Sequence, residues 1–409
     1  MKICFLIGSP EIGGGTYVIY EHALHLQEIG WDVTIISIWA PNRTLRPWHR
    51  ALERLRFATI TEVAGEDFDL SVATWWRTIY ELLPHVRTQH YCYFVQSIES
   101  WFYLNSDVAV RNLVNATYLL PIPGITEARW IKAHLAERFG HDYYLALNGC
   151  RKDDYSADGH VITPRQAGRL RVLVEGPLGV DFKNVARTIA LARRSTADEI
   201  WLLTASPVTH FPGVDRVFSR VPTSDCAAIY RSCDVLIKLS TIEGMFGPPL
   251  EMFHCGGTAI VYDVTGHDEY ISDGHNSIVV RVGEEDAVIT AINRLRQDST
   301  LLARLKEGAL ATAAAWPDWA QASAGFVEAM QAILASPPVD RQHLLMMVRE
   351  FWAQYVRVEK YLQRTKSRNW MQRIWSSIGR RYPSLNDQLR VAHAWLLESR
   401  RQPVPREQI

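Results

Sequence analysis

The stretch CFLIGSPEIGGGTYVIYEHALHL, residues 4–26, changes its pattern halfway along. The apolar run of residues 3–7 is typical of a strand covered on both faces, whereas Ile19, Ala23 and Leu26 recur at helical spacing. Three consecutive glycines lie between the two patterns. Because glycine has no Cβ, its amides can approach a ligand at the start of a helix, where anions are favoured. The stretch predicts a phosphate-binding turn; a turn required only by close packing is the alternative.

Two common phosphate-binding motifs do not fit these letters. A P-loop requires lysine where Gly14 stands, and Ser9 and Pro10 interrupt a dinucleotide-binding G-x-G-x-x-G. The sequence therefore supports neither an ATPase nor an NAD-dependent enzyme.

Composition limits the class of protein. The 409 residues suffice for two domains and an appendage. Basic and acidic residues balance at 44 each, so nucleic-acid binding is not expected. The six cysteines lack C-x-x-C spacing and the histidines form no ligand pair on one helix face, so we expect neither disulfides nor a metal nor another cofactor. No cleavable leader and no apolar run of roughly 20 residues is apparent, which predicts a cytoplasmic protein.

The first 160 residues alternate between strand-like and helix-like segments, as in a parallel sheet with helices on both faces. The predicted strands are residues 2–8, 32–38, 69–74, 91–95, 117–121 and 143–147. The predicted helices are residues 16–29, 76–84, 106–115 and 125–138. We assign residues 1–160 to a first Rossmann-like domain, whose polar end belongs to a linker over residues 151–168.

The alternation begins again after the linker and defines a second domain, residues 169–335. Its predicted strands are residues 171–174, 200–204, 234–239 and 258–262, with a helix from about residue 183. Three further helices, at residues 285–296, 300–315 and 317–334, are expected to close it. The sequence predicts an α/β protein of two doubly wound domains facing across a cleft, with ligands outside the carboxyl ends of the strands.

Residues 336–409 form a basic extension. From Arg341 onward, 14 Lys and Arg face five Asp and Glu, a net charge of +9. Apolar side chains recur at helical spacing in residues 348–362 and again in residues 370–378. A basic amphipathic helix of this kind suits an anionic membrane surface. The alternative is a helix packed on the protein itself or on a second subunit.

The segment VLIKLSTIEGMFGPPLEMFHCGG, residues 235–257, carries the chemistry. A buried strand leads into a loop with Glu243, and two prolines after Gly247 mark the start of a short helix with Glu251 in its first turn. Glycine and proline between the two glutamates exclude one continuous helix. We expect them to hold different parts of one elongated ligand.

This segment, together with the following CGGTAIVYDVTGHDEYI and DGHNSIVV, resembles the donor-site signature of retaining glycosyltransferases of family 4. The resemblance covers residues 1–335 and implies the GT-B architecture of two Rossmann-like domains. The triple glycine also resembles the family pattern. YFVQSIESWFY, from Tyr93, is similar to rhamnosyltransferase-like members that build bacterial surface polysaccharides.

The resemblance implies roles for particular residues. Glu243 would hold hydroxyls of the donor sugar and Glu251 the nucleotide ribose, since a carboxylate accepts two hydroxyl donors. The amides of Gly14 and Gly15, and those near Gly247, would hold the diphosphate. An acid in the first turn of a helix, stabilised there by the helix dipole, is the alternative for Glu251.

The family usually places an arginine and a lysine on the diphosphate. Lys183 matches the lysine, but Pro177 stands in place of the arginine. Arg187, one turn after Lys183, is a candidate replacement, with plain surface solvation as the alternative. The resemblance implies transfer with retention, in which Lys183 stabilises the leaving group without a metal and Glu243 orients the sugar.

Acceptor recognition is expected in the first domain. Gln96 and Glu99 follow a predicted strand, with Trp101 beside them, and such side chains suit the hydroxyls and faces of sugar rings. Glu99 is our candidate for positioning or deprotonating the acceptor hydroxyl. Asp67 and Asp69 form a D-x-D that we interpret as turn and strand residues, not as metal ligands.

The leading hypothesis is an enzyme that transfers a sugar from a nucleotide-sugar donor to an oligosaccharide or lipid-linked acceptor in surface polysaccharide biosynthesis. It would act in the cytoplasm, or on the inner face of the cytoplasmic membrane through residues 341–409, as a monomer or a homo-oligomer. A nucleotide-sugar epimerase and a non-catalytic sugar-binding scaffold are the alternatives.

Overall fold

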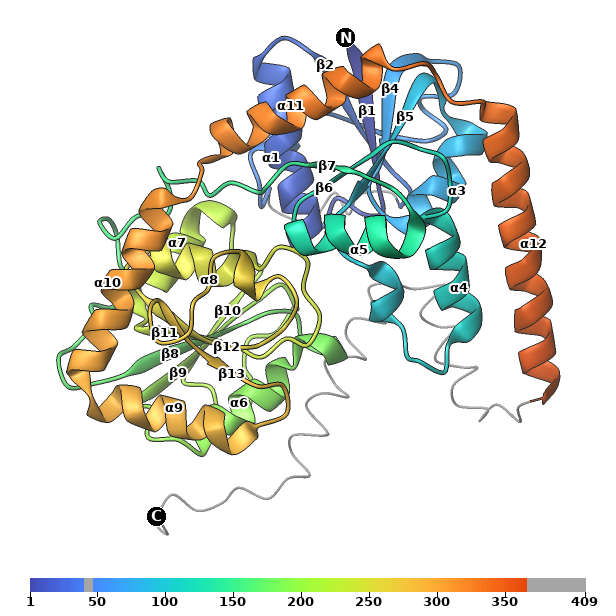
Figure 1. The fold of residues 1–409 in the computed structure, drawn as a ribbon. Coiled ribbons are helices and arrows are strands. Elements are labelled where there is room, and N and C mark those ends of the chain that lie inside the picture. The colour runs from blue at the N-terminus through green and yellow to red at the C-terminus, as the bar shows by residue number, and fades with distance from the viewer. Residues whose placement is uncertain (40–46, 366–409) are drawn as a thin grey trace. The chain divides into compact units, whose positions relative to one another are not determined.

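The computed structural model describes residues 1–39 and 47–365 of the chain. They divide into two compact units (Figure 1). The first comprises residues 1–149 and 317–365, and the second comprises residues 150–316. Each is an α/β unit around one parallel sheet, as the alternation in the sequence predicts.

The first unit has a seven-stranded sheet in the order β3-β2-β1-β4-β5-β6-β7. Its strands are β1 (Lys2–Ile7), β2 (Asp32–Ser37), β3 (Arg56–Thr59), β4 (Asp67–Ala73), β5 (Arg87–Val95), β6 (Gly124–Thr126) and β7 (Tyr144–Leu145). The order reverses between β1 and β4, and in sheets of this type ligands bind at the carboxyl ends beside such a reversal. The glycine turn after β1 lies at this point.

Helices cover both faces of this sheet. They are α1 (Gly14–Glu28), α2 (Ala51–Arg54), α3 (Trp76–His85), η1 (Glu99–Phe102), α4 (Val108–Thr117), α5 (Arg129–Phe139), α11 (Trp319–Ala335) and α12 (Arg341–Thr365). One apolar core joins α1 and α11 to the sheet, and another joins α3, α4, α5 and α12. Residues 117–121, predicted as a strand, instead end α4 and enter a turn, and β6 follows three residues later.

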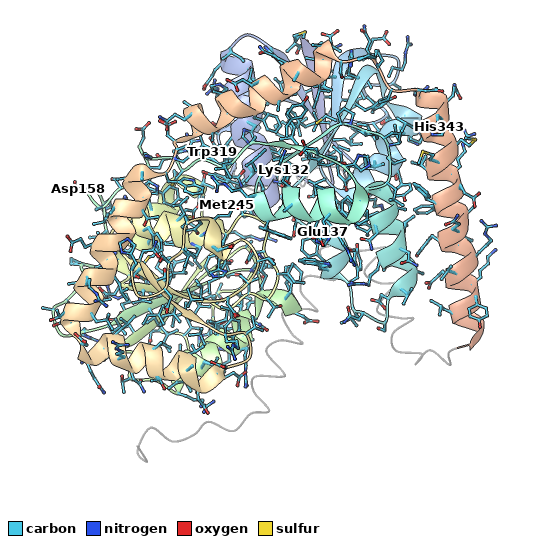
Figure 2. All side chains as sticks on the ribbon, in the orientation of Figure 1. Lys132, Glu137, Asp158, Met245, Trp319 and His343 are labelled. Carbon is cyan, nitrogen blue, oxygen red and sulfur yellow. The ribbon has the colours of Figure 1, made fainter. Side chains whose placement is uncertain are left out.

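Helix α11 lies in the first unit, whereas we had assigned residues 317–334 to the second. Phe326 is fully buried among side chains of β1 and β5, and it stacks on His22 of α1. Trp319, labelled in Figure 2, donates a hydrogen bond to the hydroxyl of Tyr17 (3.2 Å). Residues 317–334 form a helix as expected, but their apolar stripe packs on α1 and not on the preceding helices.

Helix α12 packs along α4 and α3 (Figure 1). Its buried stripe contains Leu344, Leu345 and Val348, and Arg341 donates to the carbonyl of Leu83 (3.0 Å). Of the two alternatives for the extension, packing on the protein itself is confirmed for this helix. The apolar residues predicted at 370–378 lie outside the described residues.

The second unit has a six-stranded sheet in the order β10-β9-β8-β11-β12-β13. Its strands are β8 (Arg171–Glu175), β9 (Glu199–Thr204), β10 (Arg216–Ser219), β11 (Val235–Lys238), β12 (Thr258–Tyr262) and β13 (Ser277–Val280). Its helices are η2 (Asp181–Lys183), α6 (Val185–Arg193), α7 (Thr223–Ser232), α8 (Gly247–His254), η3 (His267–Glu269), α9 (Glu285–Gln297) and α10 (Ser299–Ala315). The reversal here lies between β8 and β11.

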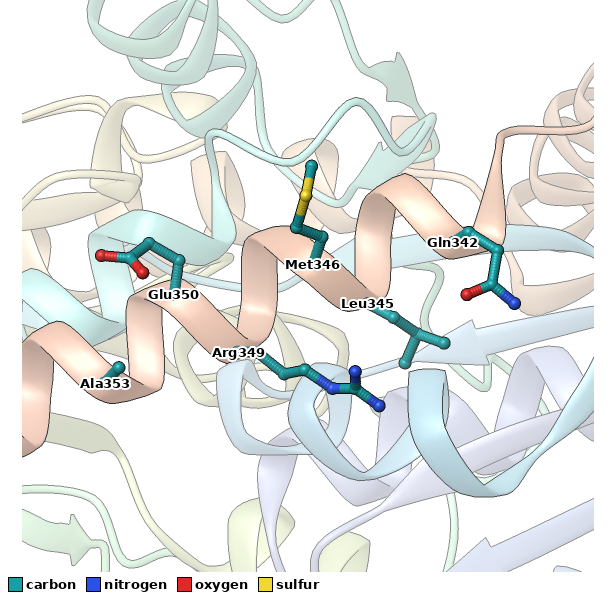
Figure 3. Close-up of a pocket in the computed structure, with 6 residues that line it drawn as sticks. All are labelled: Gln342, Leu345, Met346, Arg349, Glu350 and Ala353. Atoms are coloured by element: carbon teal, nitrogen blue, oxygen red, sulfur yellow. The ribbon is translucent and has the colours of Figure 1, made fainter.

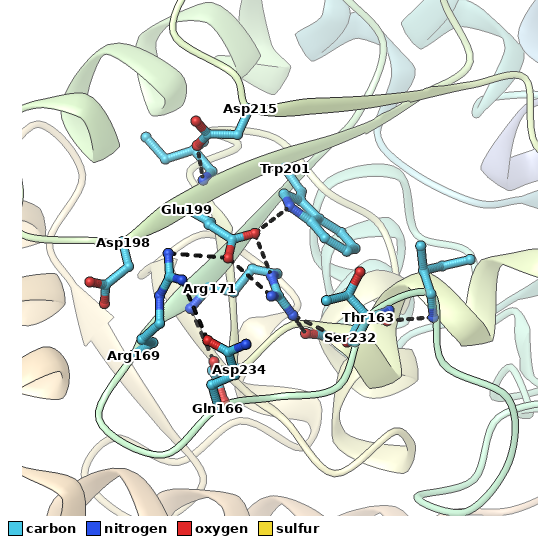
Figure 4. Close-up of polar contacts among 12 residues, drawn as sticks. Thr163, Gln166, Arg169, Arg171, Asp198, Glu199, Trp201, Asp215, Ser232 and Asp234 are labelled. Atoms are coloured by element: carbon cyan, nitrogen blue, oxygen red, sulfur yellow. Dashed lines mark hydrogen bonds and ion pairs between the residues drawn. The ribbon is translucent and has the colours of Figure 1, made fainter.

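A charged network closes the amino-terminal edge of this sheet (Figure 4). Arg171, at the start of β8, donates from Nε and Nη2 to the two oxygens of Glu199 (2.9 and 3.0 Å) and from Nη1 to the carbonyl of Ser232 (2.7 Å). The hydroxyl of Ser232 accepts from the amides of Ile162 and Thr163. The segment predicted as a linker is therefore fastened to the second unit.

Candidate functional site

The candidate site lies at the carboxyl edge of the second sheet, where a glycine turn follows β8. Gly176 has φ +140°, and a Cβ there would come within 2.9 Å of Val185, so only glycine fits without displacing α6. The register pairs Ile237 of β11 with Val174 of β8, so the next pair along is Lys238 beside Glu175. Each of these two residues is the last of its strand.

The turn around Asn184, directly after Lys183, fixes the position of this lysine. Asn184 adopts the left-handed conformation at φ 52°, which asparagine tolerates better than most residues, and its side chain donates to the carbonyl of Leu239 (2.9 Å). The amide of Thr241 in turn donates to the carbonyl of Phe182 (2.8 Å). These contacts fasten the lysine turn to the end of β11, close to Glu243.

Glu243 is buried, and Lys183 binds both of its oxygens, with each Nζ–Oε distance 2.8 Å. Lys238 lies 3.9 Å from Oε1 of the same carboxylate. Burial acts to raise the pKa of Glu243, but the attraction of Lys183 and Lys238 outweighs it, and the pKa is lowered. Glu243 is thus held as a carboxylate. The structure brings together Lys183 and Glu243, which we had both assigned to the donor site.

Lys238 and Glu175 form an ion pair that we did not predict. Lys238 is only 3% exposed. Burial acts to lower the pKa of Lys238, but Glu175 and Glu243 outweigh it and the pKa is raised, so the ammonium is retained. In the sequence both residues end apolar runs, where a charge breaks the pattern of a buried strand. A charged residue at the end of a predicted buried strand is the sequence signal that could have identified Glu175 and Lys238.

Glu251 is the fifth residue of α8, just beyond the first turn in which we expected it, and it lies near the same cluster. Burial raises the pKa of Glu251 to about 7, with a further rise from Glu175 that is opposed by a hydrogen bond from Tyr230 and by Lys238. A carboxyl group in this state accepts hydrogen bonds from hydroxyls better as the pH rises through neutrality. Tyr230, on α7, is a third residue, after Lys238 and Glu175, that the sequence analysis did not identify.

Three residues at the start of α8 bear on our expectation for the amides near Gly247. The Gly247 N–H donates to the carbonyl of Met245 (3.0 Å), and Pro248 and Pro249 have no N–H. The loop itself is fixed because the hydroxyl of Tyr270 donates to the carbonyl of Phe246. Figure 2 marks Met245 in this loop. The first turn of α8 can contribute its dipole to an anion, but these three residues offer it no free amide.

Arg187 is occupied elsewhere in the same unit. Its guanidinium forms a forked ion pair with Glu285, at the first position of α9. This contact ties α6 to α9 and accounts for Arg187 structurally. Neither of our two alternatives for Arg187, a replacement arginine or a solvated surface residue, includes this pair.

In the first unit, the glycine turn contacts Gln96, which we predicted to bind the acceptor. Gly14 begins α1, and a Cβ on Gly15 would come within 2.9 Å of Oε1 of Gln96. Gln96 donates to the carbonyl of Gly15 (3.1 Å) and to Glu127 (3.3 Å), which also accepts from Asn148 (3.0 Å). Gly15 is therefore close to Gln96, but a side chain at this position would displace only the flexible end of Gln96, so the contact by itself does not require glycine. Its place at the start of a helix leaves the anion-binding reading open.

Glu99 and Trp101 both have structural partners in this unit. Glu99 is buried and accepts from the amide of Trp76 (2.7 Å) at the start of α3. Burial raises the pKa of Glu99 to about 8, although hydrogen bonds from Trp76 and Tyr93 lower it. Trp101 stacks on Trp130 at 5.5 Å, which covers one face of its ring. The acceptor roles of both residues therefore stay predictions.

The D-x-D, possible metal ligands and possible membrane spans were also considered among the described residues. Asp69 accepts from the amide of Lys2 (2.7 Å) and Asp67 pairs with Arg87 (2.9 Å), so both acids of the D-x-D have structural partners. Across residues 1–39 and 47–365, no three His, Cys, Asp or Glu side chains are grouped as metal ligands would be. Within the same residues, no helix combines the length and apolar character needed to span a bilayer.

A hollow on α12, shown in Figure 3, is lined by Gln342, Leu345, Met346, Arg349, Glu350 and Ala353.

Comparison with known proteins gives a family match and a fold. The family model described as Glycosyl transferases group 1 matches residues 215–311, which include Glu243 and Glu251. The O-antigen biosynthesis protein RfbC of Myxococcus xanthus is 26% identical over 222 residues. This match covers 52% of the present chain but 17% of RfbC, so the chain spans about a sixth of that relative.

Solved structures resemble nearly the whole of both units. Sucrose-phosphate synthase from Thermosynechococcus elongatus has a TM-score of 0.65 at 14% identity, covering 82% of this chain and 99% of that one. HepE from Anabaena, in complex with UDP-glucose, has a TM-score of 0.65 at 16% identity, covering 81% and 100%. WaaG, a glycosyltransferase involved in lipopolysaccharide biosynthesis, has a TM-score of 0.61 at 12% identity, covering 82% and 100%. These likenesses establish that the fold is of the GT-B type.

Proposed function

We propose that this protein is a glycosyltransferase that moves a sugar from a nucleotide-sugar donor to a saccharide acceptor in polysaccharide biosynthesis. The observation that carries the proposal is the cluster of Lys183, Glu243 and Glu251 at the carboxyl edge of the second sheet. The family match over residues 215–311 and the polysaccharide-related names of RfbC and WaaG support it.

Each residue of the cluster suits one part of such a donor. Lys183 is partly exposed, with 21% of its side chain accessible, and offers three N–H donors to a diphosphate. Glu243, kept ionised, suits the hydroxyls of the sugar, and Glu251 suits those of the ribose. HepE binds UDP-glucose, so a uridine donor is the first to test.

Retention of configuration and independence from metal are the finer parts of the proposal, along with membership of family 4. They rest on the sequence resemblance described above. A lysine beside the diphosphate can stabilise its developing charge, as a divalent cation would. NMR of the anomeric configuration of the first product, and turnover with and without a chelator, test these two points.

The decisive experiment is calorimetric titration of the wild-type chain with UDP, dTDP, GDP, CDP and ADP, followed by the matching nucleotide sugars. We expect one base to bind, and Glu251→Ala to weaken that binding, because the ribose loses its acceptor. Release of the nucleoside diphosphate only when a saccharide acceptor is present identifies a transferase. Consumption of the nucleotide sugar without an acceptor identifies the epimerase, and binding without any turnover identifies the scaffold.

We also propose that residues 366–409 bring the protein to an anionic membrane surface, where a lipid-linked acceptor would lie. Because α12 uses its apolar stripe against α3 and α4, this part of the extension is committed to the first unit. The test is therefore a truncation after Thr365, which keeps α12. Loss of salt-sensitive binding to anionic vesicles supports the proposal, and unchanged binding contradicts it.

A further inference from the structure

Lys183 and Glu243 occupy each other in the structure. Both oxygens of Glu243 lie 2.8 Å from Nζ of Lys183. In the proposed function, however, Lys183 holds the diphosphate and Glu243 holds the sugar. A donor can therefore use both groups only after this ion pair has opened.

Opening the pair would leave a buried carboxylate without its principal counter-ion. Glu243 is 7% exposed, and an unpaired charge in such a position is strongly destabilising. Without another cation, Glu243 would either take up a proton or hold Lys183 in place. Both outcomes would weaken donor binding.

Lys238 is placed to prevent both outcomes, because it offers Glu243 a second cation. Its Nζ lies 3.9 Å from Oε1 of Glu243 and pairs with Glu175 at the end of the neighbouring strand. Its side chain is 3% exposed, whereas that of Lys183 is 21% exposed. The Lys183 side chain therefore reaches solvent from a turn, while the Lys238 side chain is enclosed at the end of β11.

We propose that Lys238 is a positioning residue that serves as the counter-ion of Glu243 when Lys183 turns from Glu243 to the diphosphate of the donor. The inference rests on the proposed function and deepens it. Two lysines thus share one carboxylate in the free protein, and donor binding releases one of them. The chain, which has Pro177 where the family arginine would be, gains a mobile lysine for the diphosphate without leaving Glu243 unpaired.

The competing explanation is that Lys238 itself contacts the diphosphate. An ideal Cβ built on Gly176 lies 3.9 Å from Nζ of Lys238, so this group is near the turn after β8. Combining substitutions at Lys238 and Glu243 separates the two explanations, because only the first makes Glu243 the reason that a Lys238 variant binds poorly.

The experiment is calorimetric titration of Lys238→Met, Glu243→Gln and the double variant with UDP, dTDP, GDP, CDP and ADP. In Lys238→Met, Glu243 holds Lys183 alone, and we expect the affinity for the best-binding nucleoside diphosphate to fall about tenfold. In the double variant Lys183 is released, and we expect the affinity to return to within about threefold of wild type. Lys238→Arg, which keeps the charge, should retain most of the affinity.

Two controls guard against a merely structural effect. Lys306→Met removes a lysine that pairs with Asp234 (2.7 Å), just before the amino end of the same strand, and should leave nucleotide affinity unchanged. If Lys238→Met does not fold, Glu175→Gln with Lys238→Met removes both members of the pair and leaves no unpaired charge between them. The same tenfold loss is expected from this variant, and the same recovery when Glu243→Gln is added.

The results distinguish failure of the proposed function from failure of the role assigned to Lys238. If the wild-type chain binds none of the five nucleotides, the proposed function fails and this inference fails with it. If the wild type binds and Lys238→Met binds equally well, or if Glu243→Gln does not restore binding, the proposed function stands and the role of Lys238 is wrong.

Discussion

The two edges of the six-stranded sheet in the second unit carry charge in different ways. At the amino edge, Arg171 forms a fork with Glu199, and its remaining donor reaches a backbone carbonyl (Figure 4). At the carboxyl edge, Lys183 pairs with Glu243, and Lys238 lies between Glu175 and Glu243. Glu251 lies close enough for Glu175 and Lys238 to shift its pKa. Strand β8 connects the two edges, with Arg171 as its first residue and Glu175 as its last.

The difference shows how a stabilising network can be told from a binding site. At the amino edge the geometry of the fork satisfies both ions, which is how a buried pair offsets the loss of water. At the carboxyl edge two lysines face Glu175 and Glu243, and burial raises the pKa of the neighbouring Glu251 to about 7. A cluster whose charges are not balanced internally can change its pairing when a ligand arrives.

The largest effect is expected at the amino edge. Arg171→Met should lower the free energy of unfolding by about 3 kcal/mol, because it leaves Glu199 half-buried without its fork. Urea denaturation measures this. Arg169→Met is the matched control: Arg169 approaches the same carboxylate at 3.4 Å from an exposed position, and its loss should cost under about 1 kcal/mol. Equal losses from the two variants would contradict the structural role.

The next effect belongs to the carboxyl edge. Lys183→Met should weaken nucleoside diphosphate binding about 30-fold, the loss of one charged hydrogen bond of about 2 kcal/mol. Titration calorimetry at pH 7.5 provides the measurement. Lys132→Met, which removes a lysine of α5 that pairs with Asp142 (2.6 Å), should change nothing. A change of less than threefold in Lys183→Met would remove that residue from the donor site.

A third effect depends on pH. Because the pKa of Glu251 is about 7, its ionised fraction and therefore its capacity to accept ribose hydroxyls increase from pH 6 to pH 8. We expect nucleotide affinity to rise about tenfold over that range, and to stay flat and low in Glu251→Gln. A wild-type profile as flat as that of the variant would separate Glu251 from the ribose.

The last prediction concerns how the stability of the first unit depends on pH, through Glu99. Its pKa is about 8 when folded and near 4.5 when exposed, so the folded state favours the protonated acid. The stability that this confers is complete below about pH 4.5 and is lost as the pH rises toward 8. Glu99→Gln cannot ionise, so the melting temperature of the wild type should fall relative to that of this variant as the pH rises from about 4.5 to 8, and the difference should then stay constant. Parallel melting curves would contradict the raised pKa.

Turnover by the same variant tests the acceptor hypothesis. If Glu99 only holds the start of α3 through Trp76, Glu99→Gln should keep wild-type kcat once an acceptor has been found. A large fall in kcat with an unchanged melting temperature at low pH would instead support its role toward the acceptor hydroxyl.

Most local structure follows from the order of residues alone. The alternation of apolar runs and helical periods predicts the strands β1, β2, β8 and β12 within a residue or two, because burial on both faces requires continuous apolar runs. It fails at residues 117–121, where an apolar run ends a helix, and it misses the short strands β3, β6, β10 and β13. Short runs carry too little pattern to distinguish strand from turn.

The sequence by itself determined the two α/β units and the glycine turn, because these depend on residue type and short spacing. The choice of Lys183, Glu243 and Glu251 as donor-site residues came from the resemblance to a known family and stays a prediction. Only the tertiary structure decided that α11 returns to the first unit, that Arg187 pairs with Glu285, and that Lys238 and Glu175 join the cluster. The ends of β8 and β11 are 63 residues apart in the chain and become neighbours only through the register of a parallel sheet. Residues so far apart carry no local signal of each other, so their contact is a property of the fold.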